Sequence, residues 1–438
     1  MSETSREMIV LPPHVTSFEG ALSKEDLDGL FFFSNPVRQK NSRTRKNFAY
    51  VAVNDLLEKG ALSDVNASAR HFATQWCHEA GLEENLKFCG VNMGSLFFME
   101  FTYFFIGALK AFHVSKALLE AWGPSHEMTL VDDGTYWSKV FKHTARLRDK
   151  SLRLVAVKPD LTVGDAETVN FRGIIRSIAK NILAIWNIPS AGNLKPGGIL
   201  YSAAPRYIEP LWTYDQSAPG YYLRTEFSVK ASKTIKKDFP HLVPILPSKP
   251  GDTAPRAALL QWMQKSRVLE TVSAYFDSHP LFIYQGVDFW PMVKEDFLQK
   301  IKKRILQKGA WVYSVDRWIK TLKPKMIVVD EDVTPFNQAL IERANLDRIP
   351  SIQIQHGIPE PDNHLIPIRS THLLVPGEAA KKRMLEMGAR SEQVEIVGAP
   401  HYEARFRDIP KKQYEEQVYR DLKLPHGTRI VTLITHNF

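Results

Sequence analysis

The sequence predicts an α/β protein with a doubly wound, mostly parallel sheet and a helical N-terminal extension. Two observations support this prediction. Short apolar runs of strand length alternate with helical patterns from residue 128 onward. Several of these runs end in turns that contain glycine or acidic residues. Such β-α units build parallel sheets, and ligands bind at the rim that the strand ends form.

The pattern divides the 438 residues into three units. Residues 1–125 form a helical N-terminal region, residues 126–424 form the α/β domain, and residues 425–438 begin a further strand. In the first unit, the longest apolar run covers 96–109 and is shorter than the about 20 residues that a membrane-spanning helix needs. It is either a buried core helix or a helix at a membrane interface.

The order of strands and helices in the α/β domain follows from the same patterns. We expect one sheet whose strands begin at Met128, Leu152, Ile199, Leu281, Met326, Ser351, His372 and Val394. We expect helices over 291–308, 309–322, 334–345, 379–387 and 412–422. Thr334 is the expected N-cap of its helix with Pro335 at the first position, and Gly388 is the expected stop of another helix.

Composition and missing motifs narrow the kinds of chemistry. The net charge of +9 favours anionic partners, such as a phosphorylated donor or an anionic membrane surface. The basic clusters are scattered and not interleaved with stacking aromatic residues, so nucleic acid is not an expected partner. Cys77 and Cys89 form no CxxC motif or Cys/His cluster, so we expect reduced thiols and no metal site. The sequence has no P-loop, no GxGxxG after a strand, no GxSxG and no HExxH, and we expect no cofactor.

A histidine-glycine pair follows one of the expected strands. Gln355-His356-Gly357 comes directly after the apolar run at 351–354. A histidine has a pKa near neutrality and suits the removal of a proton from an attacking hydroxyl group. His356 is therefore a candidate general base, and the other interpretation is a structural histidine that caps the strand end. Gly357 permits a tight turn or the close approach of a ligand.

Three carboxylates follow another expected strand. Asp330, Glu331 and Asp332 end the run at 326–329. Asp330 or Glu331 is the favoured catalytic candidate, as a base or as a group that orients an acceptor. The other interpretation is a solvated turn. Like charges this close raise one another's pKa unless they are separated or solvated.

Further candidates for substrate binding lie at neighbouring turns. They are Gly357, Gly377, Glu378, Gly398, Pro400, His401 and Arg206. Glu378 begins a helix, so its other interpretation is a favourable interaction with the helix dipole. His401 would contact a phosphate, and Arg206 would pair with an anionic acceptor or be an ordinary surface arginine. Asp132 and Asp133 form a second acidic strand end and are weaker candidates.

Three of these motifs, in order, resemble a known family. Gln355-His356-Gly357, Gly377-Glu378 and Val397-Gly398-Ala399-Pro400 are similar to the end of the N-terminal domain in GT-B-fold glycosyltransferases. The resemblance is greatest to the CDP-glycerol glycerophosphotransferase type of bacterial surface-polysaccharide and teichoic-acid transferases. It covers roughly Lys323 to His401 and extends more weakly back to about residue 197. It implies a Rossmann-like acceptor-side domain, in which the histidine matched by His356 is the proposed base.

The resemblance implies an inverting, metal-independent transferase. The donor would be a nucleotide-activated sugar or a CDP-alcohol, and the acceptor would be a surface glycan or a lipid-linked acceptor. The protein would be cytoplasmic, either free or peripheral at the inner face of the plasma membrane, where an anionic surface attracts basic charge. The close alternative is a UDP-sugar 2-epimerase-like enzyme, since such enzymes share the fold and similar turns.

The end of the chain supports a third alternative. Residues 428–438 begin a strand that no helix follows. In GT-B enzymes the second domain begins at this point, carries most of the donor site, and would need about 150 or more further residues. We therefore expect a truncated chain that is inactive alone. It is either part of a transferase or a non-catalytic acceptor-binding module or remnant.

Overall fold

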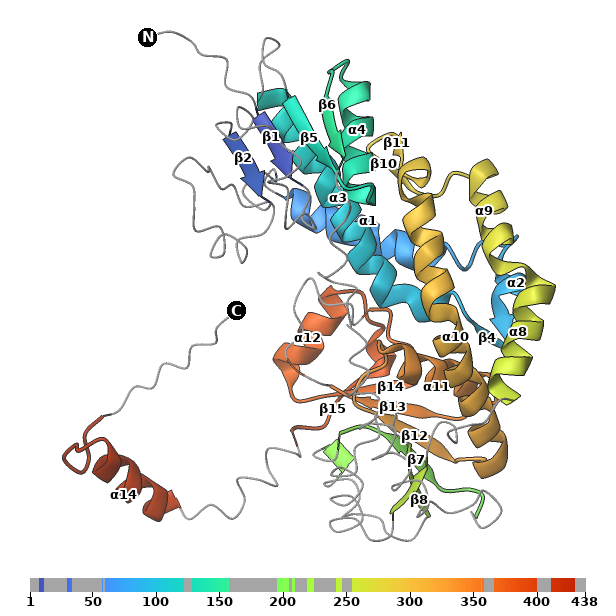
Figure 1. Cartoon of the computed structure of the whole chain (residues 1–438). Helices are drawn as coiled ribbons and strands as arrows, with labels where there is room; N and C mark the ends of the chain where they lie inside the picture. The colour runs from blue at the N-terminus through green and yellow to red at the C-terminus, as the bar shows by residue number, and fades with distance from the viewer. Residues whose placement is uncertain are drawn as a thin grey trace, which may run out of the picture.

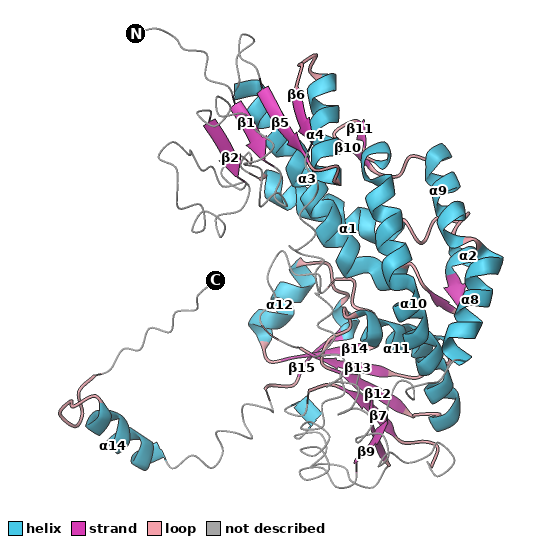
Figure 2. Cartoon of the chain, viewed as in Figure 1, coloured by secondary structure: helices cyan, strands magenta, loops and turns pink. Residues whose placement is uncertain are grey.

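A seven-stranded parallel sheet forms the centre of the C-terminal half of the chain (Figures 1 and 2). Its strands are β7 (Ile199–Ser202), β8 (Gly220–Leu223), β9 (Leu242–Ile245), β12 (Met326–Val329), β13 (Ser351–Ile354), β14 (His372–Val375) and β15 (Val394–Ile396). They lie in the order β15-β14-β13-β12-β7-β8-β9, and each neighbouring pair is parallel. The computed structural model describes residues 8–11, 30–33, 57, 60–121, 128–156, 195–204, 207–208, 219–223, 242–245, 254–355, 357, 366–399 and 411–429.

The first strand of this sheet along the chain is β7, and later strands are added first on one side of it and then on the other. β8 and β9 lie on one side of β7, and β12 to β15 lie on the other. Ser202 at the end of β7 pairs with Val329 at the end of β12, so the two strands end at the same level. The reversal between them is the topological switch point of a doubly wound sheet, where such folds bind ligands. The predicted α/β class is thus confirmed as a Rossmann-like parallel sheet flanked by helices.

Among the described residues, the helices that belong to this sheet are α10 (Trp290–Leu322), α11 (Pro335–Leu346) and α12 (Glu378–Glu386). On one face, Val315 of α10 and Leu340 of α11 join Leu200 and Ile327 of the sheet in one buried cluster. The strands read as nearly continuous apolar runs because the central strands of a parallel sheet are buried on both faces. Packing of apolar helix stripes on these strands therefore holds the switch point in place.

The helix ends follow the sequence prediction except within α10. Thr334 is the N-cap of α11 and Pro335 its first residue, and Gly388, with φ +102°, follows α12. The prediction of two helices over 291–322 was wrong, because α10 is one helix of 33 residues. Glycine weakens a helix by about 1 kcal/mol relative to alanine. Glycine is nevertheless favoured at position 309, because Leu259 of α8 (Ala254–Ser266) packs directly against the backbone there. A Cβ at this position would lie 2.4 Å from Leu259 Cδ1.

A second parallel sheet, of four strands, lies in the N-terminal half (Figure 1). Its strands are β1 (Met8–Leu11), β2 (Leu30–Phe33), β5 (Met128–Asp132) and β6 (Arg153–Ala156), in the order β2-β1-β5-β6. The prediction of one sheet was therefore wrong, and the expected boundary at residue 125 falls between strands of this sheet. β1 and β2 escaped prediction because a four-residue apolar run carries too little periodicity to be assigned alone.

The run expected as a strand at Leu281 belongs to neither sheet. It forms β10 (Ile283–Tyr284), which pairs antiparallel with β11 (Val287–Asp288). The intervening Gln285 and Gly286 both have positive φ, at 48° and 78°, as a two-residue type I′ hairpin turn requires. Local turn chemistry therefore decides this pairing.

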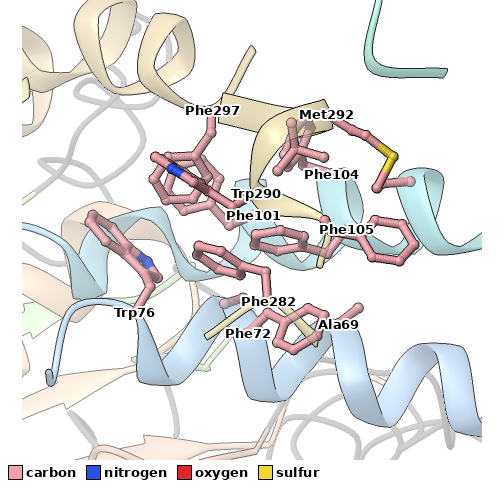
Figure 3. Packing of buried hydrophobic residues seen from close by; sticks show 14 of the residues in the cluster. Ala69, Phe72, Trp76, Phe101, Phe104, Phe105, Phe282, Trp290, Met292 and Phe297 are labelled. Atoms are coloured by element: carbon pink, nitrogen blue, oxygen red, sulfur yellow. The ribbon is translucent and has the colours of Figure 1, made fainter. Parts of the chain in front are cut away.

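Aromatic side chains dominate the core that forms among the helices outside the seven-stranded sheet (Figure 3). The helices are α1 (Ala61–Gln75), α3 (Phe98–Ala121), α4 (Tyr136–Leu147) and α9 (Val268–Ser278), together with α8 and the first half of α10. Phe101 of α3 stacks on Phe297 of α10 with ring centroids 4.0 Å apart, and Phe105 stacks on Phe282 at 5.0 Å. Such ring pairs contribute about 0.5–1.5 kcal/mol beyond the burial of their area.

The stretch Ser95–Glu120 is long and apolar enough to cross a membrane by length and composition, but 67% of its most apolar window is buried inside the protein. The core-helix interpretation is therefore confirmed. The remaining short elements are α2 (Glu83–Leu86), β3 (Lys87–Phe88), β4 (Val91–Asn92), the 3-10 helices η4 (Ser95–Phe97) and η6 (Ser391–Gln393), and α14 (Lys411–Asp421). α14 stands apart from both sheets in Figure 1.

Candidate functional site

A cavity of about 560 Å³ lies at the switch point of the seven-stranded sheet. Its lining comes from the ends of β7, β8 and β12, from α10 and from the first turn of α11. The lining residues are Ser202, Ala203, Ala204, Tyr222, Leu223, Gln307, Trp311, Asp330, Glu331, Thr334, Pro335, Phe336 and Asn337. The volume lies within the range of about 300–1,000 Å³ that is usual for small-molecule sites.

Hydrogen bonds tie the strand ends at the base of this cavity to one another. Ser202 Oγ donates to Asn337 Oδ1 at 2.6 Å, and Asn337 Nδ2 donates to the carbonyl oxygen of Glu331 at 2.8 Å. Asp330 Oδ2 accepts the backbone N–H of Ala204 at 2.8 Å. These bonds fix the turns after β7 and β12 against α11, so the base of the cavity is preorganised.

Aromatic rings form the other wall. Trp311 of α10 meets Phe336 of α11 edge to face, with ring centroids 6.2 Å apart and an interplanar angle of 89°. Tyr222 of β8 also lines the cavity, but it is buried in a different cluster, with Tyr201 and Val328. One turn before Trp311, Gln307 accepts a hydrogen bond from Arg304 Nη1 at 3.4 Å. The cavity thus pairs an apolar aromatic wall with a polar base.

The three carboxylates of the acidic run have different positions. Asp330 and Glu331 line the cavity, whereas Asp332 is fully buried away from it. Asp332 Oδ2 accepts the backbone N–H groups of Arg369 at 2.6 Å and Ser370 at 3.2 Å. The amide of Gln353, oriented with its nitrogen toward this carboxylate, donates to it at 3.0 Å. The run is therefore not a solvated turn.

The environment of Asp332 alters its ionisation. Burial raises the pKa of its carboxyl, and the charge of Arg369 and the backbone N–H bonds oppose this rise. The expected effect of neighbouring like charges is not the main cause, because the run is split between cavity and core. Asp332 instead joins the turn after β12 to the segment that leads into β14.

A second polar cluster continues from Arg369 into the N-terminal half. Glu342 of α11 accepts a hydrogen bond from Ser95 Oγ at 2.7 Å and one from Gln338 Nε2 at 3.1 Å, and lies 3.8 Å from Arg369 Nε. The Arg369 guanidinium also lies 4.9 Å from the ring centroid of Phe98. These contacts dock the start of α3 on the helix whose first turn lines the cavity.

The predicted turns lie at one rim, but only some reach the cavity. β12, β13, β14 and β15 are neighbours and parallel, so the prediction that the turns after Val329, Gln355, Val375 and Val397 share one rim is confirmed. Neighbouring strands lie about 4.8 Å apart. The turns after β14 and β15 are therefore about 10–15 Å from β12 along the sheet. None of the described residues of these two turns lines the cavity.

Among the glycines of these turns, two have positive φ and one does not. Gly357 has φ +78° and Gly398 has φ +79°, so both use the conformational freedom of glycine. Gly377 has φ 178°, which any residue adopts. Exposed Glu378 is the first residue of α12, a position in which a carboxylate favours the helix dipole.

Gln355 shapes the turn that contains the candidate base. Its Nε2 donates to the carbonyl oxygen of Gly357 at 2.7 Å, across the intervening residue, and its Oε1 is buried without a hydrogen-bond partner. His356 itself lies outside the described residues, as do Pro400, His401 and Arg206.

The weaker acidic candidates belong to the four-stranded sheet. Asp132 Oδ2 pairs with Lys142 Nζ at 2.7 Å. Asp133 Oδ1 accepts hydrogen bonds from the hydroxyl groups of Thr135 and Ser138, both at 2.7 Å. These bonds order the turn into α4, so both carboxylates have structural partners and neither lines the switch-point cavity.

No metal centre is found in the part of the chain that the structure describes, since no three His, Cys, Asp or Glu side chains are grouped to hold an ion. Cys77 and Cys89 are free thiols. Burial raises the pKa of both, that of Cys89 to about 11, so they are protonated and weakly nucleophilic at neutral pH.

Sequence reasoning missed the side chains that approach the switch point from helices. Trp311 and Gln307 lie on α10, which precedes β12, and Asn337 lies in the first turn of α11. Nothing in their local pattern distinguishes them from ordinary helix residues.

No family model matches the sequence, and no curated protein matches it.

Proposed function

We propose that this chain supplies the acceptor side of a transferase that uses a nucleotide-activated sugar or a CDP-alcohol as donor and extends a surface glycan. The observation that supports this proposal best is the switch-point cavity, in which Asp330 and Glu331 stand at the end of β12 beside the ordered Ser202–Asn337 pair. Strand-end carboxylates at a switch point are well placed to hold and orient a hydroxyl group.

His356 is the proposed general base of this reaction. It follows β13, the neighbour of β12, and Val329 pairs with Gln353 across these strands. The strand that precedes it therefore ends about one strand spacing, or about 4.8 Å, from the strand that precedes Asp330. A neutral imidazole would take the acceptor's hydroxyl proton as the oxygen bonds to the donor's anomeric carbon or phosphorus. The bond to the nucleotide phosphate breaks, and that phosphate leaves with the electron pair.

A non-catalytic acceptor-binding module is the second candidate. The described lining of the cavity comes from the seven-stranded sheet, α10 and α11, which together already form a concave site for a ligand. Both candidates act in the cytoplasm, and peripheral contact with an anionic membrane surface is the form of attachment that the +9 charge favours.

Transfer by the full-length encoded protein tests the proposal. The protein would be incubated with panels of nucleotide sugars, CDP-alcohols and glycan acceptors, and products would be detected by mass spectrometry. Asp330→Asn should lower turnover, whereas Glu386→Gln, at an exposed carboxylate near the end of α12, should not. Binding of an acceptor without transfer from any donor would favour the module instead.

A further inference from the structure

We propose that the N-terminal edge of the seven-stranded sheet docks on an anionic lipid bilayer through four exposed cations. These cations, called the basic rim below, are Lys195, Lys323, Lys325 and Arg348. This inference rests on the proposed function only for the idea of a membrane contact, which it locates on the molecule. Docking needs no transfer activity, so the two proposals can fail separately.

The basic rim lies in the three connections that enter neighbouring strands at one edge. These connections precede β7, join α10 to β12, and join α11 to β13. The first two are in contact, because the backbone N–H of Lys325 donates to the carbonyl oxygen of Gly198 at 2.9 Å. The third is tied to β12, because Ile327 N–H donates to the carbonyl oxygen of Pro350 at 3.0 Å. Neighbouring strands lie about 4.8 Å apart, so the three connections span about 10 Å of the edge.

Prolines stiffen all three connections. Pro196 follows Lys195, Pro324 separates the two lysines before β12, and Pro350 lies two residues after Arg348. The ring of proline fixes its φ near about −65° and removes freedom from the backbone. Cations on stiff connections lose less conformational entropy when they meet a surface. The basic rim is therefore preorganised for binding.

The charge of the basic rim is not matched by acidic residues. All four side chains are exposed, and none makes an ion pair with any residue that the structure describes. Asp316 of α10 and Asp347 at the end of α11 pair instead with Lys320 at 2.8 Å and Arg343 at 2.9 Å. The C-termini of α10 and α11 each contribute about half a negative charge. About three positive charges remain, and they attract an anionic surface.

An exposed leucine beside these cations favours a bilayer over a soluble polyanion. Leu346, two residues before Arg348, is 55% exposed. Surfaces that combine basic and apolar side chains bind at the membrane interface, where the apolar group enters the headgroup region. Single-stranded nucleic acid would instead need aromatic side chains on which bases stack. None of the described residues in the three connections is aromatic.

The basic rim and the switch-point cavity lie at opposite ends of the same strands. β7 and β12 each run for four residues from the rim to the end at which the cavity opens. Four strand residues span about 13 Å. A protein held by the basic rim therefore keeps its cavity away from the lipid headgroups. An acceptor would reach the cavity as the end of a chain and not as a headgroup.

Vesicle co-sedimentation of the 438-residue chain tests the proposal. Vesicles of equal parts phosphatidylglycerol and phosphatidylcholine would be compared with vesicles of phosphatidylcholine alone. We expect binding to the anionic vesicles only, and added sodium chloride should weaken it because salt screens exposed charges. Replacing all four cations of the basic rim by Gln should weaken binding about 100-fold or more, since each cation near an anionic surface strengthens binding about fivefold.

A matched control separates the basic rim from net charge. It also replaces four exposed lysines by Gln, but on other elements: Lys265 of α8, Lys302 of α10, Lys382 of α12 and Lys423 after α14. Binding should stay within about threefold of the wild type, because salt screens charges that lie far from the contact.

Two smaller variants keep the test valid if the fourfold variant does not fold. Lys195→Gln combined with Lys325→Gln leaves the cations after the two helices in place and should weaken binding about 25-fold. Leu346→Ser should weaken the binding that persists at high salt about threefold or more, because it removes the apolar contact.

Three outcomes would overturn the inference: binding that does not distinguish the two kinds of vesicle, equal weakening by the matched control, or rim-dependent binding of polyphosphate without binding to anionic vesicles. None of them would remove the transferase, which the panels of donors and acceptors test. Rim-dependent vesicle binding without transfer from any donor would do the opposite, because it would retain the docking surface and remove the transferase.

Discussion

The Asp332 carboxylate accepts the backbone N–H of Arg369 at 2.6 Å, which joins two segments that are 37 residues apart in the chain. Asp332 follows the two cavity carboxylates in the sequence, and Arg369 lies just before β14. Asp332, the third acidic residue of the run, thus fixes the turn after β12 to the residues before β14. Its role is structural, since it does not line the cavity.

Asp332→Ala should destabilise the protein and loosen both segments. It removes the acceptor of the buried Ser370 N–H and of the Arg369 N–H. Each buried N–H that loses its partner costs about 1–3 kcal/mol. Urea unfolding gives the total loss, and amide hydrogen exchange should accelerate at residues 369 and 370. Asp332→Asn keeps an acceptor oxygen and should lose less, so an equal loss in both variants would contradict this role.

The pH dependence of stability provides a separate test of the same residue. Burial raises the pKa of Asp332 above its ordinary value near 3.8, so the folded protein holds this proton more tightly than the unfolded chain does. The resulting stabilisation is present at low pH and is lost as pH rises through the folded pKa. The free energy of unfolding of the wild type should therefore fall relative to that of Asp332→Asn as pH rises above the ordinary value near 3.8. A relative gain by the wild type would mean that Arg369 and the N–H donors outweigh burial.

Gly198→Ala should separate the strands on which the cavity rests. A Cβ at Gly198 would lie 2.0 Å from the carbonyl oxygen of Pro219, which accepts the N–H of Ile199 where β7 and β8 begin. Overpacking against backbone costs about 1–3 kcal/mol or more. Gly377→Ala is the matched control, since that position is extended and has no atom within 4 Å of an added Cβ. Thermal unfolding should show a large loss for the first variant only.

The sequence predicted five strands of the seven-stranded sheet and missed two. Runs such as Met326–Val329 are apolar, β-branched and closed by acidic residues, which is a strong local signal. β8 (GYYL) and β9 (LVPI) are equally short but begin with glycine or contain proline, and both residues are depleted in strands. Their place is set by pairing with β7, which is a tertiary effect.

The candidate site was predictable where it depends on strand ends. Asp330 and Glu331 could be expected because parallel strands place their terminal residues at one rim. Trp311 could not be expected at the site, because its position depends on the path of α10. That helix continues through Gly309, which is packed against Leu259, before it reaches Trp311. Asp332 ends the same acidic run but was not a favoured candidate, and the turn after β12 directs it into the core.

The most direct test of the account is the effect of His356→Ala on turnover and on melting temperature, measured on one preparation of the full-length encoded protein with the donor and acceptor that the panels identify. If His356 is the general base beside the switch-point cavity, turnover should fall about 100-fold or more while the melting temperature stays within about 1 °C. Acceptor binding should persist, because many described residues of other strands and helices line the cavity. A lowered melting temperature with full turnover per folded molecule would instead make His356 a structural residue and contradict the proposed transfer mechanism.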